Sequence, residues 1–487
     1  MKSEIVKGVS WSVLMRWTLK LLGLINVAIL ARLLAPEDYG IVAMATLAYG
    51  MVTLFIDFGT GMLIMRSKSV NDELLNAAWT AKVLQGFLLA LVLLLLTPLF
   101  SRYFNNLILN EIMWVYALSA FISGFENIGI ILFRKNLEYK KDFQLEFISK
   151  VGSVVLTIGL AFWLRSFWAL VYGQLVGSLL RLLLSYSMHT YRPQVCFKGM
   201  KQFILFSMSL IFINIGKYTS QNISLLVGGR ILATDAMGLL NVSVNFASIF
   251  TQEIMLPVAR AMFPQYAKLK HDPAQLKKAY LGVLSTLALV LFPVGFGVSA
   301  VSTELVTIIL GDKWLSIDYL VSWLAIAGVL RAIIWVLSGN ILIVTNNENK
   351  SALCSWLQLA ILAPMVIYAG DKWGMIGMVK ATVIASCITL PIMAFVLKTP
   401  LNSSMGEIFQ CLFKPAFSSF VMFFSLYFFP WADYHILVLL LAKASLGIVI
   451  YIAVTMLIWL VLGMRDGVEK QIVVFIMTQL KQKLHHQ

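Results

Sequence analysis

The chain has 487 residues, of which 60% are hydrophobic and 13% are charged. A soluble globule of this size could not cover so much apolar surface, so the composition excludes a water-soluble enzyme and indicates a membrane protein. The net charge of +15 does not indicate nucleic-acid binding, because the lysines and arginines lie mainly in short gaps between apolar runs and form no basic face.

Apolar runs long enough to cross a bilayer recur along the whole chain, and about 14 of them approach the ~20 residues that the hydrocarbon core requires. They predict an all-α membrane protein with helices at 11–33, 41–64, 77–100, 111–133, 146–164, 166–187, 203–229, 236–264, 279–301, 319–342, 352–369, 374–397, 412–429 and 436–462. The first run contains Arg16 and Lys20 and lacks a small-residue cleavage site, so we expect a retained helix and no signal peptide.

The basic residues of the gaps alternate along the chain. About 22 lysines and arginines fall in every second gap or at the two ends, and about 6 fall in the other gaps. Because positively charged loops are retained on the cytoplasmic side, this alternation predicts a multi-pass protein with both termini in the cytoplasm.

Two short stretches repeat each other at a constant offset of 198 residues. ARLLAPEDYG occupies 31–40 and GRILATDAMG occupies 229–238, so Arg32 corresponds to Arg230 and Gly40 to Gly238. Six predicted helices separate the two copies, an even number, which is typical of a parallel repeat with a pseudo-twofold axis along the membrane normal. We interpret the two arginines as anchors at the membrane interface, each placed before a helix break.

The repeat also predicts the domain organisation. We expect two six-helix lobes at 1–198 and 199–398, followed by two extra helices at 399–463. The segment 464–487 has apolar residues at helical spacing opposite lysines, which predicts an amphipathic tail on the cytoplasmic membrane surface.

Several motifs follow one another in a fixed order through the first 400 residues. They are GVSWS at 8–12, the two repeated stretches, DFG at 57–59, RKNLEY at 134–139, VARAMFPQYAKLKHD at 258–272, FPVG at 292–295 and LGDKW at 310–314. In this order they resemble the polysaccharide-transporter branch of the multidrug/oligosaccharidyl-lipid/polysaccharide exporter superfamily.

The resemblance implies a Wzx-type flippase of the bacterial inner membrane. Such a protein moves an undecaprenyl-pyrophosphate-linked oligosaccharide repeat unit from the cytoplasmic to the periplasmic leaflet by alternating access, for exopolysaccharide or lipopolysaccharide assembly. The implied partners are this lipid-linked sugar, the lipid bilayer and, as a candidate, a polysaccharide polymerase. No cofactor is implied.

Cations within the predicted helices are the first candidate site residues, because a charge at mid-depth must face a partner or an aqueous cavity. Lys20, Lys217 and Arg331 lie near the middle of their runs, and Lys20 falls one residue from the repeat equivalent of Lys217. We expect them to bind the pyrophosphate headgroup, with internal salt bridges as the alternative. The other cations near helix ends, Lys82, Lys150, Arg260 and Lys380, are expected to extend to the lipid headgroups.

Three acids form the second candidate set. Asp57, Glu126 and Glu253 are expected to be buried in the inner halves of their helices, where an unpaired carboxyl group would tend to hold a proton. They are therefore candidates for proton or sodium coupling. A structural ion pair, such as Glu253 with Arg260, is the alternative.

Two other functions remain as alternatives. A multidrug-type exporter of small molecules coupled to H⁺ or Na⁺ would share the fold, although mid-helix cations disfavour cationic drugs. A membrane glycosyltransferase or polymerase is less favoured, because the longest outer gap, 302–318, holds no paired catalytic carboxylates and no nucleophile with a base. The histidines show no metal-ligand spacing.

Overall fold

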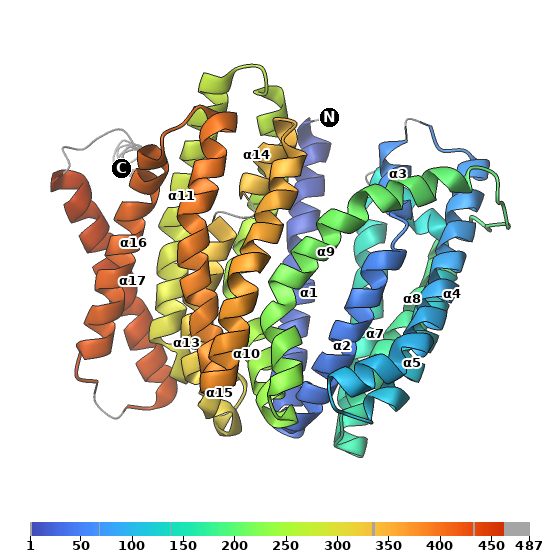
Figure 1. The fold of residues 1–487 in the computed structure, drawn as a ribbon, viewed down its shortest axis with the longest axis horizontal. Helices are drawn as coiled ribbons and strands as arrows, with labels where there is room; N and C mark the ends of the chain where they lie inside the picture. Colours follow the sequence, from blue (N-terminus) through green and yellow to red (C-terminus); the bar gives the residue numbers. More distant parts are fainter. Residues whose placement is uncertain (1, 68, 137, 334–336, 432–433, 462–487) are drawn as a thin grey trace, which may run out of the picture. The chain divides into compact units, whose positions relative to one another are not determined.

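The computed structural model describes residues 2–67, 69–136, 138–333, 337–431 and 434–461, and helices make up most of this part of the chain (Figure 1). The α-helices are α1 Lys2–Leu33, α2 Pro36–Ile56, α3 Thr60–Arg66, α4 Asp72–Tyr103, α5 Leu109–Gly124, α6 Ile131–Lys135, α7 Tyr139–Leu164, α8 Trp168–Met188, α9 Met200–Ile231, α10 Thr234–Lys268, α11 Pro273–Ala300, α12 Ser302–Ile309, α13 Asp318–Arg331, α14 Leu337–Val344, α15 Glu348–Leu401, α16 Met405–Phe428 and α17 Ile436–Val461. Two short 3₁₀ helices are η1 Ile128–Ile130 and η2 Asp312–Ile317. The predicted all-α class is confirmed.

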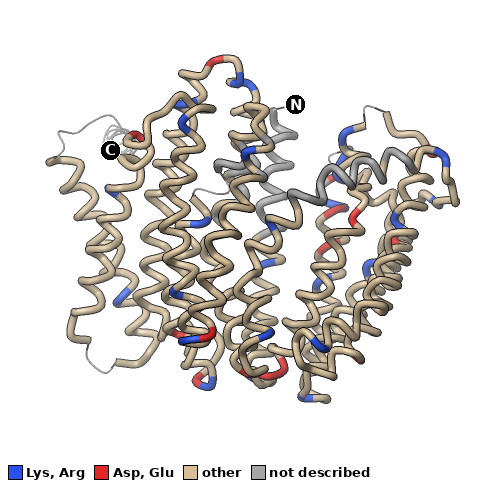
Figure 2. The backbone as a smooth tube through the Cα atoms, in the orientation of Figure 1, with Lys and Arg blue, Asp and Glu red and all other residues tan. Residues whose placement is uncertain are grey.

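Every predicted apolar run falls on one or more of these helices. Within the described residues, nine helices are long and apolar enough to cross a membrane, or ten if the bent pair 109–124 and 128–135 forms one span. Long stretches of the chain without charged residues run between the groups of Lys, Arg, Asp and Glu (Figure 2). Membrane insertion is therefore supported, and the number of 14 crossings stays a prediction.

The 198-residue repeat holds at the level of whole helices. α1 and α9 each contain 32 residues, and both their first and their last residues are 198 positions apart. α2 and α10 begin with the same offset, at Pro36 and Thr234. The last turns match as well, since the amide of Leu34 donates to the Leu30 carbonyl and that of Leu232 to the Gly228 carbonyl, both at 2.8 Å.

The two copies of the repeated motif pack directly against each other. A Cβ atom added to Gly40 would lie 1.9 Å from the carbonyl oxygen of Thr234, and one added to Gly238 would lie 1.8 Å from that of Pro36. The N-terminal turns of α2 and α10 thus cross backbone against backbone. Such an approach requires a residue without a side chain, which explains why glycine ends both copies of the motif.

The contacts divide the chain into two compact units, residues 1–241 and 242–487. In the first unit, α4 packs on α5, α7 packs on α8 and α1, and α2 packs on α9. In the second, α11 packs on α13 and α16, and α16 packs on α17. The predicted lobe boundaries at 198 and 398 stay predictions, and the predicted tail at 464–487 lies outside the described residues.

Two predicted continuous helices are broken by polar side chains that bond to nearby backbone. Between α2 and α3, the Asp57 carboxylate accepts the Gly59 amide at 2.9 Å, and Gly59 adopts a left-handed conformation with φ of 58°. Between α5 and η1, Asn127 Oδ1 accepts the Gly129 amide at 2.9 Å, at a bend of 70°. These local hydrogen bonds compete with the helical ladder and end the helix within an apolar run.

The long helix α15 also contains a break, at the position where the sequence predicts a gap between two spans. Gly374 has φ of 59° and ψ of −145°, a conformation that only glycine adopts readily. The predicted separation of the spans 352–369 and 374–397 is therefore confirmed.

Within the second unit, α17 is joined to α12 by a charge pair as well as by packing. Lys443 on α17 donates to Glu304 on α12, and the side chains are 16% and 4% exposed. Lys443 also lies 5.6 Å from the centre of the Trp431 ring. This contact fixes the N-terminal third of α17 against α12.

The crossing at Gly40 yields a stability prediction. Gly40→Ala places a methyl group on the Thr234 carbonyl, so we expect it to destabilise the protein by about 1–3 kcal/mol or more. The measurement is the thermal unfolding midpoint of the purified protein in detergent.

The matched control is Gly23→Ala on α1, where an added Cβ meets no atom within 4 Å. This substitution should leave the midpoint unchanged or raise it slightly, because alanine is the better helix former. Equal midpoints for the two variants would contradict the crossing.

Candidate functional site

The three predicted headgroup cations all lie on helices. Lys20 is partly exposed on α1 and Lys217 is exposed on α9, at 13 and 14 residues before the last residues of their helices. The two lysines therefore lie at nearly equal distances from the last residues of their helices, about 20 Å at ~1.5 Å per residue. Arg331 is partly buried at the last position of α13, in the second unit.

The three predicted carboxylates differ from one another in their environments. Asp57 is exposed at the break after α2, so the expectation that it is buried was wrong; it lies where its carboxylate bonds to the Gly59 amide. Glu126 is buried, as predicted. Glu253 belongs to α10, but its side chain and that of Arg260 lie outside the described residues.

Glu126 forms two ion pairs in the interior of the first unit. Its Oε2 accepts from Lys82 Nζ at 2.8 Å, and its Oε1 accepts from Arg181 Nε at 3.1 Å. The prediction that Lys82 extends to the headgroups was wrong, because a buried carboxylate lies within its reach. Each charge offsets the large desolvation penalty of the other.

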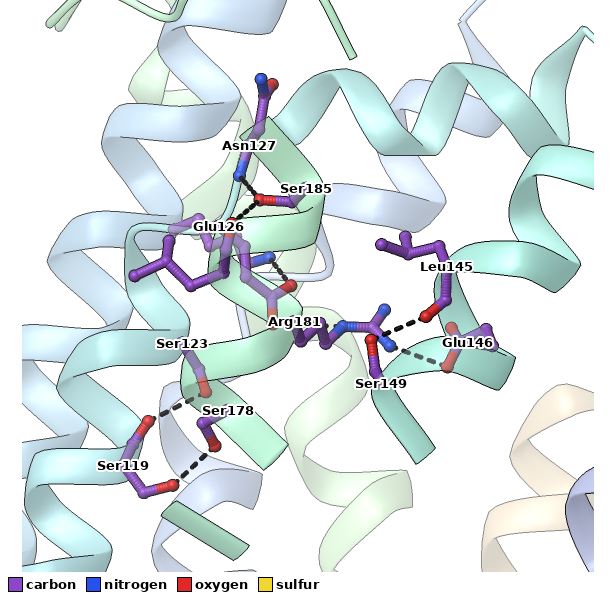
Figure 3. Close-up of polar contacts among 12 residues, drawn as sticks. Ser119, Ser123, Glu126, Asn127, Leu145, Glu146, Ser149, Ser178, Arg181 and Ser185 are labelled. Atoms are coloured by element: carbon purple, nitrogen blue, oxygen red, sulfur yellow. Dashed lines mark hydrogen bonds and ion pairs between the residues drawn. The ribbon is translucent and has the colours of Figure 1, made fainter. Parts of the chain in front are cut away.

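The ion pairs continue beyond Glu126 as a chain of alternating charges, part of which is seen in Figure 3. Arg181 Nη1 donates to Glu146 at 2.7 Å, and the other Glu146 oxygen accepts from Arg134 at 2.9 Å. Arg134 also donates to Asp142 at 2.9 Å. We call this set the charge chain; it comprises Lys82, Glu126, Arg181, Glu146, Arg134 and Asp142 and contains three positive and three negative groups.

The bend after α5 positions Glu126. The Asn127 amide donates to Ser185 Oγ at 3.0 Å, and the Asn127 side chain donates to the Tyr191 carbonyl at 2.6 Å. These bonds tie the bend both to the end of α8, where Figure 3 shows the contact with Ser185, and to the segment that follows α8. The chain therefore turns at Glu126 and directs its carboxylate toward Arg181 on α8.

A polar cavity of about 380 Å³ lies beside the charge chain in the first unit. Its walls come from α1, α5, α7 and α8 and include both Glu126 and Arg181. Lys150, another cation predicted to extend to the headgroups, lines this cavity and is exposed. Lys380, from the same predicted group, is exposed with its Nζ 5.6 Å from the centre of the Tyr319 ring.

A larger cavity of about 930 Å³ lies in the second unit. It is lined mainly by apolar side chains of α11 and α16, including Leu289, Phe292 and Phe413. Leu330, the neighbour of Arg331, also lines it. The candidate cation Arg331 therefore directly follows, in the sequence, a residue that lines this apolar cavity.

Sequence reasoning missed the charge chain because its members are distributed over five segments. The available signal was the pair of acids at 142 and 146, one helical turn apart on α7, together with Arg134 in the RKNLEY motif. Arg230 also has a partner that the motif could not reveal: its Nη1 donates to the Arg102 and Tyr103 carbonyls at the end of α4, at 3.2 and 3.0 Å. That contact compensates the negative end of a helix dipole.

The charge chain yields a second stability prediction. Glu126→Gln leaves Lys82 and Arg181 without their shared anion, so we expect a loss of about 3–5 kcal/mol. Adding Lys82→Met to the Glu126→Gln variant should restore part of the lost stability. The control is Glu73→Gln, which breaks an exposed pair with Lys198 and should change stability much less, because water screens that pair. Thermal unfolding midpoints decide; equal effects of the two glutamine variants would argue against a structural role.

Comparison with known proteins agrees with the fold. The chain covers 99% of the chain of a solved structure described as "Lipid II flippase MurJ, inward closed conformation", with 93% of its own length, a TM-score of 0.73 and 13% identity. It also covers 99% of an inward-facing multidrug resistance transporter of the MATE family in the MOP superfamily, with 80% of its own length, a TM-score of 0.57 and 14% identity.

Curated relatives match over most of the chain. The lipopolysaccharide biosynthesis protein WzxC of Escherichia coli is 24% identical over 86% of this chain and 86% of its own length. The teichuronic acid biosynthesis protein TuaB of Bacillus subtilis is 21% identical over 85% and 86%. The family model described as "Polysaccharide biosynthesis protein" matches residues 29–318, more than half of the chain. The chain therefore belongs to the polysaccharide biosynthesis protein family.

Proposed function

We propose that the protein flips a lipid-linked oligosaccharide, an undecaprenyl-pyrophosphate-linked repeat unit, from the cytoplasmic to the periplasmic leaflet of the bacterial inner membrane. The observation that carries the proposal is the likeness over nearly the whole chain to proteins named for polysaccharide biosynthesis, together with a fold shared with a lipid II flippase. A transporter does no bond chemistry, so binding and alternating access of the two lobes perform the work.

The substrate has three chemically different parts, and the chain offers an environment suited to each. The apolar cavity of the second unit suits a polyprenyl chain, because most of its lining side chains are apolar, leucine and phenylalanine above all. Lys20, Lys217 and Arg331 suit the pyrophosphate, because cations that replace water around an anion lower the energy of moving it through the membrane. The glycan is rich in hydroxyl groups and needs a polar wall, which the cavity of the first unit provides.

The energy source in this proposal is the membrane potential, aided by ion coupling at an acid. Export of each negative charge along an inside-negative potential is favoured by about 2.3 kcal/mol per 100 mV. Because both oxygens of Glu126 are engaged by cations, a coupling proton or sodium ion must displace Lys82 or Arg181 to bind there. Asp57, which is exposed, and Glu253 stay coupling candidates in this proposal.

Deletion of the gene tests this function. We expect loss of a surface polysaccharide and accumulation of its lipid-linked repeat unit, measured by mass spectrometry of the lipid extract. Plasmid-borne wild type should restore export, and Lys20→Ala, Lys217→Ala and Arg331→Ala should not, although each variant accumulates in the membrane. Unchanged glycan in the deletion strain, with altered resistance to cationic drugs, would instead indicate the multidrug-type exporter.

Cysteine labelling tests the proposed orientation with both termini in the cytoplasm. In a background without Cys196, Cys354, Cys387 and Cys411, a cysteine at Asn402 should resist a membrane-impermeant maleimide in intact cells. A cysteine at Lys372, in the exposed turn near the break of α15, should react. The reverse pattern would invert the orientation.

A further inference from the structure

The polar cavity of the first unit has the size and wall of a small-ligand site. Its volume of about 380 Å³ lies within the ~300–1,000 Å³ typical of such sites. Six uncharged polar side chains line it: Asn26, Ser123, Ser153, Thr157, Gln174 and Ser178.

The hydroxyl groups of this wall already use their protons within the protein. Ser153 Oγ donates to the Gly173 carbonyl at 3.0 Å, and Thr157 Oγ1 donates to the Ser153 carbonyl at 2.7 Å. Ser123 Oγ donates to the Ser119 carbonyl at 2.9 Å. Because a hydroxyl has one proton and two lone pairs, each of these groups can offer a lone pair to a ligand, so the wall favours a ligand that donates hydrogen bonds.

Two amide side chains add groups that both donate and accept. The Oδ1 atom of Asn26 is buried and accepts no hydrogen bond from any described residue. Gln174 is exposed, and no hydrogen bond to its side-chain amide is found within the described ranges. Amides of this kind can bond to neighbouring hydroxyls of a sugar ring, which act as donor and acceptor in turn.

The charged lining of the cavity leaves one cation uncompensated. Glu126 and Arg181 belong to the charge chain, whose three positive and three negative groups balance. Lys150 lies four residues after Glu146 on α7, the spacing of a helical ion pair, but the two Glu146 oxygens are engaged by Arg134 and Arg181. No ion pair joins Lys150 to another residue in the part of the chain that the structure describes. The cavity therefore has a surplus of one positive charge.

We propose that this cavity binds a sugar residue that carries a single carboxylate, a hexuronic acid or a similar acidic sugar. Lys150 Nζ holds the carboxylate, and the hydroxyl and amide side chains hold the ring hydroxyls. The inference rests on the proposed function, because it identifies the sugar as part of the transported glycan.

A pyrophosphate fits the same cavity less well. It carries several negative charges and offers acceptors almost exclusively, whereas the serine and threonine groups have no proton left to donate. Arg181, the other lining cation, already directs Nε to Glu126 and Nη1 to Glu146. One free ammonium group matches one carboxylate.

Sugar binding to the purified full-length chain in lipid nanodiscs tests the inference. The probes are D-glucuronate, D-glucose and inorganic pyrophosphate, and the dissociation constants come from saturation-transfer NMR titrations. We expect glucuronate to bind at least about tenfold more tightly than glucose, because a charge-assisted hydrogen bond is stronger than a neutral one. Gln174→Ala should weaken the binding of both sugars.

Substitutions of Lys150 separate charge from shape. Lys150→Gln should lower glucuronate affinity to the level of glucose and leave glucose binding unchanged, whereas Lys150→Arg should keep the preference. The matched control is Lys140→Gln, an exposed lysine of the same helix that does not line the cavity and should change neither affinity. Unfolding midpoints verify that each variant is folded.

Three results would overturn the inference. The first is equal affinity of the wild-type chain for the two sugars, which includes no binding of either. The second is an unchanged preference for glucuronate in Lys150→Gln, and the third is stronger binding of pyrophosphate than of glucuronate at the same site. If the deletion strain loses its glycan while any of these is found, the flippase function stands and the sugar site is wrong. If glucuronate binds as expected but the deletion leaves the glycan unchanged, the site stands and the proposed flippase function is wrong.

Discussion

The pairing of buried charges is the constraint on which the first unit depends. Several kcal/mol are needed to bring a single ion out of water, so a charged group remains ionised within packed helices only beside an opposite charge or in an aqueous cavity. The chain from Lys82 to Asp142 satisfies this requirement by alternating signs across α4, the bend after α5, α6, α7 and α8. It joins these segments by electrostatic contacts that apolar packing alone does not provide, and it leaves Lys150 as the charge that a ligand can use.

Much of the fold could be predicted from the sequence, because an apolar run and a repeated motif can each be recognised within a short stretch of the chain. The apolar runs gave the helix positions, and the 198-residue offset of two ten-residue motifs extends to the ends of α1 and α9. The breaks at Asp57 and Asn127 could not be predicted from hydropathy, since one side chain that bonds to the backbone ends a helix while the run stays apolar.

The candidate site was less predictable, because charge pairing depends on contacts between distant segments. Lys82 and Glu126 are 44 positions apart, so helical spacing does not indicate their contact. Considered alone, Lys82 resembles a lysine that extends to the headgroups, and Glu126 resembles a protonated acid. Together they form a fixed ion pair, so the depth of a residue within a run does not establish its role.

The Lys443–Glu304 contact has a consequence for how the C-terminal helices can be treated in experiments. Truncation after α15, or fusion of a reporter at that point, would remove Lys443 and leave Glu304 buried without its cation on the short helix α12. The C-terminal helices α16 and α17 are thus not a detachable extension. A topology study based on nested truncations would perturb the second unit itself, which makes full-length sandwich fusions the sounder design for this chain.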